Sequence, residues 1–177
     1  QNGSIDKDLY TKYDVKRGLR NTNGTGVLVG LTRIGDVVGY EMRDGEKIAI
    51  PGKLVYRGYN VIDLINDAEK NKQFGFEQTA YLLIFGELPN EKQLSRFKEY
   101  LGECRTLPNN FTEDMIMKAP SQDIMNKIAR GVLASYSYDE DPENRSVGNI
   151  VRQCIQLLAR FSTLAAYGYQ AKRRYYD

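Results

Sequence analysis

From residue 60 to its end, the chain places apolar residues three or four positions apart, in segments separated by polar residues, glycine or proline. This spacing follows one face of an α-helix, which turns once every 3.6 residues or so. The pattern therefore predicts a mainly α, multi-helical fold. The expected helices cover residues 61–70, 76–85, 91–104, a short segment that begins at Thr112, residues 122–135 and residues 147–174.

Residues with strong capping preferences stand at the ends of these segments. Asn60, Asn90 and Ser121 directly precede three of the expected helices. Their side-chain oxygens suit the free N–H groups of a first helical turn. Gly86 follows the segment 76–85, and glycine readily adopts the left-handed conformation that commonly ends a helix. Local chemistry thus predicts most of the helix boundaries.

The segment 147–174 is the most apolar of the expected helices. Its apolar face is wider than a surface helix usually shows, and comprises Ile150, Val151, Cys154, Ile155, Leu157, Leu158, Phe161, Leu164 and Ala165. Such a face needs cover on most sides, so we expect the chain to associate through this helix or its neighbours. Arg152 and Arg160 within the segment argue against a membrane span.

The first 57 residues follow other patterns. Apolar spacing predicts a short amphipathic helix over residues 5–17. Between residues 27 and 57, short β-rich runs alternate with turn signals at Gly35, Asp44-Gly45 and Pro51-Gly52. Asp44-Gly45 is a strong hairpin signal, because both central residues of a type I′ turn have positive φ. We expect a small N-terminal β-hairpin region next to the helices, and one domain over residues 1–177.

Composition excludes several classes of function. The net charge of +2 is too small to indicate a nucleic-acid or anionic membrane partner. Lys172-Arg173-Arg174 is by itself typical of a solvated helix end. Cys104 and Cys154 belong to no CxxC pair, so we expect no zinc site and interpret both as small packed apolar residues. No secretory signal opens the sequence, which predicts a cytoplasmic location.

The chain contains no histidine, which excludes Ser–His–Asp and Cys–His catalytic arrangements within it. The acidic stretch 137–144 lacks the spacing of a calcium loop, so we interpret it as a solvated loop without a metal. Residues 23–26 lead into a strand rather than a helix, which favours a turn over a phosphate cradle. These residues alone indicate a mainly α domain without an assigned function.

Five segments resemble, in order, the N-terminal part of the citrate synthase family. They are GLRN with GTGVLVGLT (residues 18–21 and 24–32), LVYRGYNVIDL (54–64), FEQTAYLLIFGELP (76–89), Leu107-Pro108, and LLARFSTLAA (157–166). The resemblance runs roughly from Lys16 to Lys172. Each segment alone is a weak signal, but all of them in the family's order and spacing make a strong one.

The resemblance implies a portion of the citrate synthase large domain that forms a homodimer. The family condenses acetyl-CoA with oxaloacetate to citrate and CoA in the tricarboxylic acid cycle, with an aspartate as base and two histidines as acids and electrostatic stabilisers. It implies acetyl-CoA as a substrate, no further cofactor and no metal. Because this chain has no histidine, no catalytic residue is expected in it, and the chain alone is expected to be inactive.

Three positions depart from the family pattern. Residues 124–126 are Ile-Met-Asn where the family often has HPM, Ser162 replaces a proline, and Gln170 stands near an expected arginine. The resemblance implies that Arg20 contacts the phosphates of CoA, and that Lys172 or Arg173 replaces the missing arginine. Without the resemblance, all three are ordinary surface charges.

Two alternatives stay open. In one, the chain belongs to a 2-methylcitrate synthase, which differs in acyl-pocket residues beyond residue 177. In the other, it is a non-enzymatic helical module that keeps this half of the fold for binding or regulation, which also explains the absence of histidine. A histidine-bearing segment encoded downstream of Asp177 distinguishes the enzyme from the module.

Overall fold

The computed structural model describes residues 7–13, 18–21, 24–27 and 32–177. It divides into two compact units, residues 1–54 and residues 55–177. The predicted mainly α fold with a small β region is confirmed, since helices make up most of the second unit and a three-stranded sheet of order β1-β2-β3 precedes them. The prediction of one domain over residues 1–177 stays a prediction.

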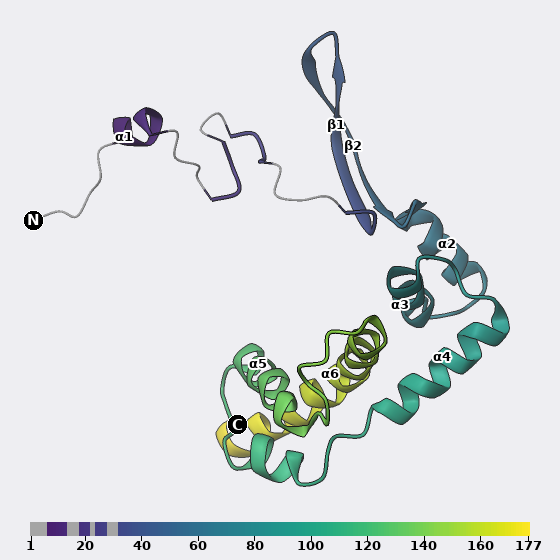
Figure 1. Cartoon of the computed structure of the whole chain (residues 1–177), viewed down its shortest axis with the longest axis vertical. Helices are drawn as coiled ribbons and strands as arrows, with labels where there is room; N and C mark the ends of the chain where they lie inside the picture. Colours follow the sequence, from purple (N-terminus) through teal and green to yellow (C-terminus); the bar gives the residue numbers. More distant parts are fainter. Residues whose placement is uncertain (1–6, 14–17, 22–23, 28–31) are drawn as a thin grey trace, which may run out of the picture. The chain divides into compact units, whose positions relative to one another are not determined.

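The first unit contains a β-hairpin. β1 spans Gly35–Arg43 and β2 spans Glu46–Tyr56, and Asp44 and Gly45 join them. Both joining residues have positive φ, 52° and 84°, as a type I′ turn requires. Figure 1 shows the two strands side by side as a long ribbon. The hairpin predicted from Asp44-Gly45 is confirmed.

The strand break predicted at Pro51-Gly52 is wrong. β2 continues through both residues. Proline cannot donate to a neighbouring strand, but β3 pairs only with the last residues of β2. Among the described residues, most of β2 therefore has a neighbouring strand on one side only, and proline is tolerated at such a free edge. α1 spans Lys7–Lys12, within the helix predicted over residues 5–17. Residues 5–6 and 14–17 of that prediction lie outside the described residues, as do residues 28–29 of the first predicted β-rich run, which covers residues 27–29.

The second unit opens with a tight turn at Arg57 and Gly58, whose φ angles are 48° and 90°. β3 spans Tyr59–Asn60 and pairs antiparallel with the end of β2. The Arg57 guanidinium donates to the carbonyl oxygen of Leu83, from Nη2 at 2.9 Å and from Nε at 3.3 Å. This contact ties the turn to the last turn of the second helix that follows it.

Three helices begin or end at the predicted residues. α2 spans Val61–Lys70, α3 spans Phe76–Phe85 and α4 spans Glu91–Cys104. The side chain of Asn60 accepts the N–H of Ile62 at 3.1 Å, and Gly86 ends α3 with a φ of 88°. Asn90 and Gln93 form a reciprocal capping box with distances of 2.8 and 2.9 Å. The predictions for these caps are confirmed.

One helix start agrees with the prediction and another differs. The π-helix η1 spans Thr112–Met117 and begins at the predicted residue Thr112, directly after the fully buried Phe111. α5 spans Ile124–Ser135 and is capped by Asp123 rather than by Ser121. Asp123 Oδ1 accepts the N–H of Asn126 at 3.0 Å, and its carboxylate also suits the positive end of the helix dipole.

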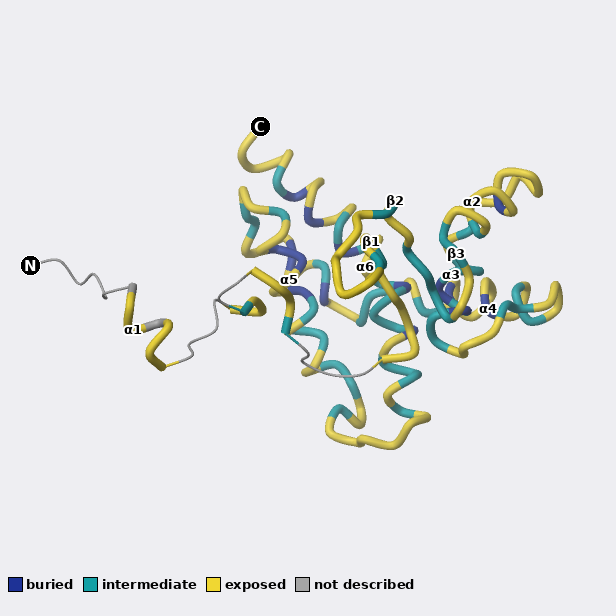
Figure 2. Tube along the Cα trace, turned by 90° about the horizontal axis from the view of Figure 1, so that it is seen from above, coloured by how far each residue is buried: buried dark blue, intermediate teal, exposed yellow. Residues whose placement is uncertain are grey.

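The last helix, α6, spans Val147–Tyr176 and joins two apolar cores. Its 30 residues make it about 45 Å long. One core comprises Ala80, Phe97, Leu101, Ile155 and Ala159; the other comprises Phe111, Ile116, Leu164 and Ala171. The first half of α6 therefore packs on α4 and shares the first core with α3, and the second half packs on η1 and α5 (Figure 1). In Figure 2 the buried residues of this unit are drawn in dark blue.

Part of the apolar face of α6 stays exposed. Phe161 is 47% exposed, and Cys154 is also exposed. The prediction that the cysteines pack as small apolar residues is confirmed for Cys104, which lies half-buried against the first core, and is wrong for Cys154. Ile155 faces the core, so its neighbour in sequence, about 100° further around the helix, faces outwards.

Candidate functional site

The residues predicted to contact phosphate lie in both units. Arg20 belongs to the first unit, where its side chain is exposed. Its Nη1 donates to the carbonyl oxygen of Gly24 at 3.3 Å, and its backbone forms a bridge with Gly26. The guanidinium thus lies against a local turn of its own chain. Its role as a phosphate contact stays a prediction.

Lys172 and Arg173 lie near the end of α6, with Lys172 half-buried and Arg173 exposed. Consecutive residues of a helix point about 100° apart, so α6 does not place these two charges on one face. The two side chains therefore point in different directions, although the residues are adjacent in the sequence. Their phosphate role also stays a prediction.

A hollow of about 490 Å³ lies between the end of α6 and η1. Gln170 and Arg174 both line it, and their four-residue spacing places them on one face of the helix. Arg174 therefore stands one turn from the position where the resemblance places an arginine. The sequence prediction missed Arg174, although its spacing from Gln170 is a signal that points to it. Tyr167, Tyr175 and Glu113 contribute to the rest of the lining.

A buried lysine forms hydrogen bonds to the backbone of η1 and of the residues after it, next to this hollow. Lys127 of α5 is 4% exposed, and its Nζ donates to the carbonyl oxygens of Met115 and, at 2.8 Å, of Ala119. Burial lowers the pKa of Lys127, and the charge of Arg130 adds to this effect. A Cβ placed on Gly168 of α6 would lie 3.3 Å from the lysine Cγ, so only a small residue lets the two helices approach this closely.

A second polar cluster lies where the loop after α5 meets α6. Asp139 Oδ1 accepts from Arg152 Nη2 at 2.6 Å, and its other oxygen accepts from Gln153 Nε2 at 3.0 Å. The N–H of Asp141 donates to Asp139 Oδ1 at 3.0 Å. That backbone bond, followed by the bonds from Arg152 and Gln153, lowers the pKa of Asp139 and outweighs the effect of desolvation. The cluster fastens the loop to the helix.

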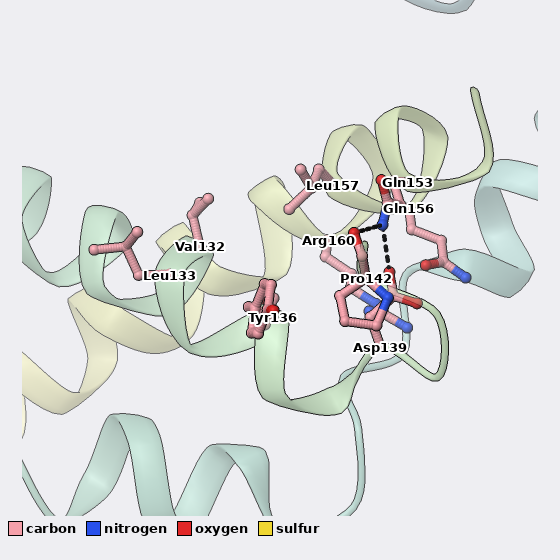
Figure 3. A pocket seen from close by; sticks show the side chains of 10 residues that line it. Val132, Leu133, Tyr136, Asp139, Pro142, Gln153, Gln156, Leu157 and Arg160 are labelled. Atoms are coloured by element: carbon pink, nitrogen blue, oxygen red, sulfur yellow. Dashed lines mark hydrogen bonds between the residues drawn. The ribbon is translucent and has the colours of Figure 1, made fainter. Parts of the chain in front are cut away.

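Beside this cluster, a hollow of about 430 Å³ lies between α5 and α6 (Figure 3). Val132 and Leu133 contribute from α5, and Leu157 and Arg160 from α6. η2, which spans Tyr136–Tyr138, continues the same lining. The hollow thus combines an apolar wall with one guanidinium group.

The described residues include neither a cluster of side chains suited to a metal ion nor a helix suited to span a membrane. Over residues 7–13, 18–21, 24–27 and 32–177, no three histidine, cysteine, aspartate or glutamate side chains gather so as to hold a metal ion. In the same ranges, no helix has both the length and the apolar character needed to cross a membrane. The groups that line the hollows are guanidinium, amide, carboxylate, hydroxyl and apolar groups.

Comparison with known proteins connects this chain with one family. A family model described as "Citrate synthase, C-terminal domain" matches residues 19–176. The citrate synthase of Saccharolobus solfataricus is 29% identical over 89% of this chain and 36% of its own length. Citrate synthase 1 of Mycobacterium tuberculosis is 32% identical over 67% of this chain and 26% of its own length. A 2-methylcitrate synthase of Shewanella oneidensis is 31% identical over 66% of this chain and 29% of its own length.

Solved structures share the fold. The citrate synthase of Thermoplasma acidophilum, in a ternary complex with carboxymethyl coenzyme A and oxaloacetate, matches with a TM-score of 0.65 and 20% identity over 84% of this chain and 35% of its own. The citrate synthase of Pyrobaculum aerophilum matches with the same score and identity over 98% and 41%. The chain spans about a third of the length of these relatives. Since the family model matches residues 19–176, the chain belongs to the citrate synthase family.

Proposed function

We propose that this chain is part of an enzyme that condenses acetyl-CoA with oxaloacetate to citrate and CoA. The family match over residues 19–176 is the observation that carries the proposal. The chain has no histidine, so the acid–base chemistry of the reaction falls to residues outside these 177. In this proposal the 177 residues of this chain contribute to substrate binding and to the stability of the fold, and the isolated chain is inactive.

The binding contribution is electrostatic and concerns the phosphates of CoA. Arginine matches phosphate bidentately, and lysine matches it as a point charge. At the end of α6, Arg174 lines a hollow together with Gln170, so we add it to the predicted residues Lys172 and Arg173. Arg20 is the candidate of the first unit.

Kinetics of the protein that contains this chain test the phosphate contacts. Arg20→Ala and Arg174→Ala should each raise the KM for acetyl-CoA about five- to thirtyfold, because an exposed charge-assisted hydrogen bond contributes about 1–2 kcal/mol. The KM for oxaloacetate should not change. Arg96→Ala, on the exposed face of α4, is the matched control. Unchanged acetyl-CoA kinetics in either variant would remove that arginine from the site.

A second assay tests whether the chemistry lies outside this chain. The purified 177-residue chain should release free CoA from acetyl-CoA and oxaloacetate only at the background rate. Turnover above that rate, persisting after a further purification step, would contradict the assignment of the reaction to other residues.

We further propose that the enzyme is a homodimer and that α6 lies in its interface. Val147, Ile150, Cys154 and Phe161 recur at spacings of three, four and seven residues, which places them on one face of α6. Val147 is 78% exposed, Ile150 is 45% exposed and Phe161 is 47% exposed. An exposed apolar seam of this kind suits a second copy of the same helix.

Sedimentation of the chain and of two isoleucine variants tests this interface. Ile150→Glu should shift the protein from dimer to monomer, because it places a charge on the seam. Ile62→Glu is the matched control, since Ile62 is 56% exposed and lies on α2. Cys154 provides a second probe, because mild oxidation should cross-link two copies through it. A monomeric parent chain at tens of micromolar would contradict the proposal.

A 2-methylcitrate synthase is the second candidate function, favoured by the relative from Shewanella oneidensis. Comparing turnover of the native protein with acetyl-CoA and with the acyl-CoA that has one more carbon distinguishes the two enzymes. A protein that turns over neither, yet binds CoA, would support the non-enzymatic module. The cytoplasmic location stays a prediction.

A further inference from the structure

The hollow between α5 and α6 has the form of a small-molecule site. Its volume of about 430 Å³ falls within the range of about 300–1,000 Å³ that such sites usually have. Val132, Leu133 and Leu157 give it an apolar wall, and Arg160 gives it a positive charge (Figure 3). Leu133 is 75% exposed, so the apolar wall extends to the surface of the molecule.

Arg160 lacks a counter-ion among the described residues. Its Nε atom is buried, and no acceptor within the described part of the chain reaches it. A guanidinium group stays ionised and offers five N–H donors, and burying a donor without an acceptor is unfavourable. Asp139 lines the same hollow, but its oxygens already accept from Arg152, Gln153 and the N–H of Asp141.

The neighbouring charges restrict the ligand that suits Arg160. An adjoining polar hollow of about 540 Å³, which Arg160 also lines, contains Glu140 and Asp141. Glu143 accepts the hydroxyl of Tyr136 at 2.6 Å, which keeps another carboxylate near the rim. These carboxylates repel a doubly charged anion more strongly than a singly charged one. The surroundings therefore favour one negative charge on an apolar body.

We propose that this hollow binds a small aliphatic monocarboxylate. Its carboxylate pairs with the guanidinium of Arg160, and its chain lies against Val132, Leu133 and Leu157. Such a pair supplies the acceptor that the buried Nε of Arg160 lacks and covers apolar surface at the same time. The proposal does not depend on the proposed function, because no residue assigned to the CoA phosphates lines this hollow.

Calorimetry and ligand-detected NMR with hexanoate test the proposal on the 177-residue chain. Hexanoate should bind about tenfold more tightly than hexanamide, which has the same shape without the charge. Hexyl phosphate, a dianion near neutral pH, should bind more weakly than hexanoate. Arg160→Gln should weaken hexanoate binding at least about tenfold, whereas Arg160→Lys, which keeps the charge, should stay within about threefold of the parent.

Two further variants keep the test decisive. Arg105→Gln is the matched control, since Arg105 lines a different, apolar hollow of about 710 Å³ and should not affect binding. Leu133→Glu places a negative charge at an exposed position of the wall and should weaken binding without unfolding the chain, as circular dichroism would show. Equal binding of hexanoate and hexanamide, unchanged binding in Arg160→Gln and Leu133→Glu, tighter binding of hexyl phosphate, or no hexanoate binding at all would each overturn the proposal.

Discussion

Replacing Leu101 with alanine should destabilise the helical unit by about 3 kcal/mol. Leu101 is 2% exposed and belongs to the core that Phe97, Ile155 and Ala159 share. Removing about three buried carbon groups at roughly 0.8 kcal/mol each gives about 2.4 kcal/mol of lost transfer free energy. The cavity that remains contributes the rest, because the surrounding helices relax only in part.

The same substitution at Leu133 is a matched control. Leu133 is 75% exposed, so only about a quarter of its surface is buried and the same arithmetic predicts a loss of about 0.6 kcal/mol. Urea unfolding followed by circular dichroism measures the free energy of unfolding of both variants. A loss at Leu133 equal to or larger than the loss at Leu101 would refute the assignment of the core.

Three further changes test local features of the fold. Asn90→Ala removes the capping box of α4 and should lower the free energy of unfolding by about 1 kcal/mol in the same urea experiment; an unchanged midpoint would contradict the cap. The pKa of Asp139 is lowered in the fold, so its ionised form stabilises the protein above the ordinary carboxyl pKa, and this contribution disappears as the pH falls through the folded-state pKa. Asp139→Asn should therefore flatten the acid limb of a stability–pH profile, and a limb identical to the parent's would count against the network. The pKa of Lys127 is also lowered, so the unfolded state binds more protons between the two pKa values, and stability should rise with pH as the folded-state lysine loses its proton. Lys127→Met should remove that alkaline rise, and its persistence in the variant would assign it to other groups.

Local sequence signals predicted the helix ends well. Asn60, Gly86 and Asn90 act within one turn of the chain, so their chemistry does not depend on distant contacts. The Asp44-Gly45 turn was predictable for the same reason, because its two residues determine the backbone angles. At α5, Ser121 and Asp123 both offered an acceptor, and the sequence does not show which of them the backbone path selects.

Features that depend on two distant segments were not predictable. Lys127 becomes buried because Gly168, on another helix, allows α6 to approach it. Arg160 reads in the sequence as a charge within an apolar helix, and only the packing of α5 shows the hollow that it lines. Arg20, Lys172 and Arg173 stay predictions from the family resemblance, whereas Arg174 was recognised from the hollow beside α6 that it lines together with Gln170.

We propose that this chain belongs to an enzyme that forms citrate. Mass spectrometry of the products that the native protein makes from isotopically labelled acetyl-CoA and oxaloacetate tests this claim most directly. We predict labelled citrate and free CoA in equal amounts, with formation that depends on both substrates. The absence of any condensation product, with acetyl-CoA or with its one-carbon-longer homologue, would contradict the claim.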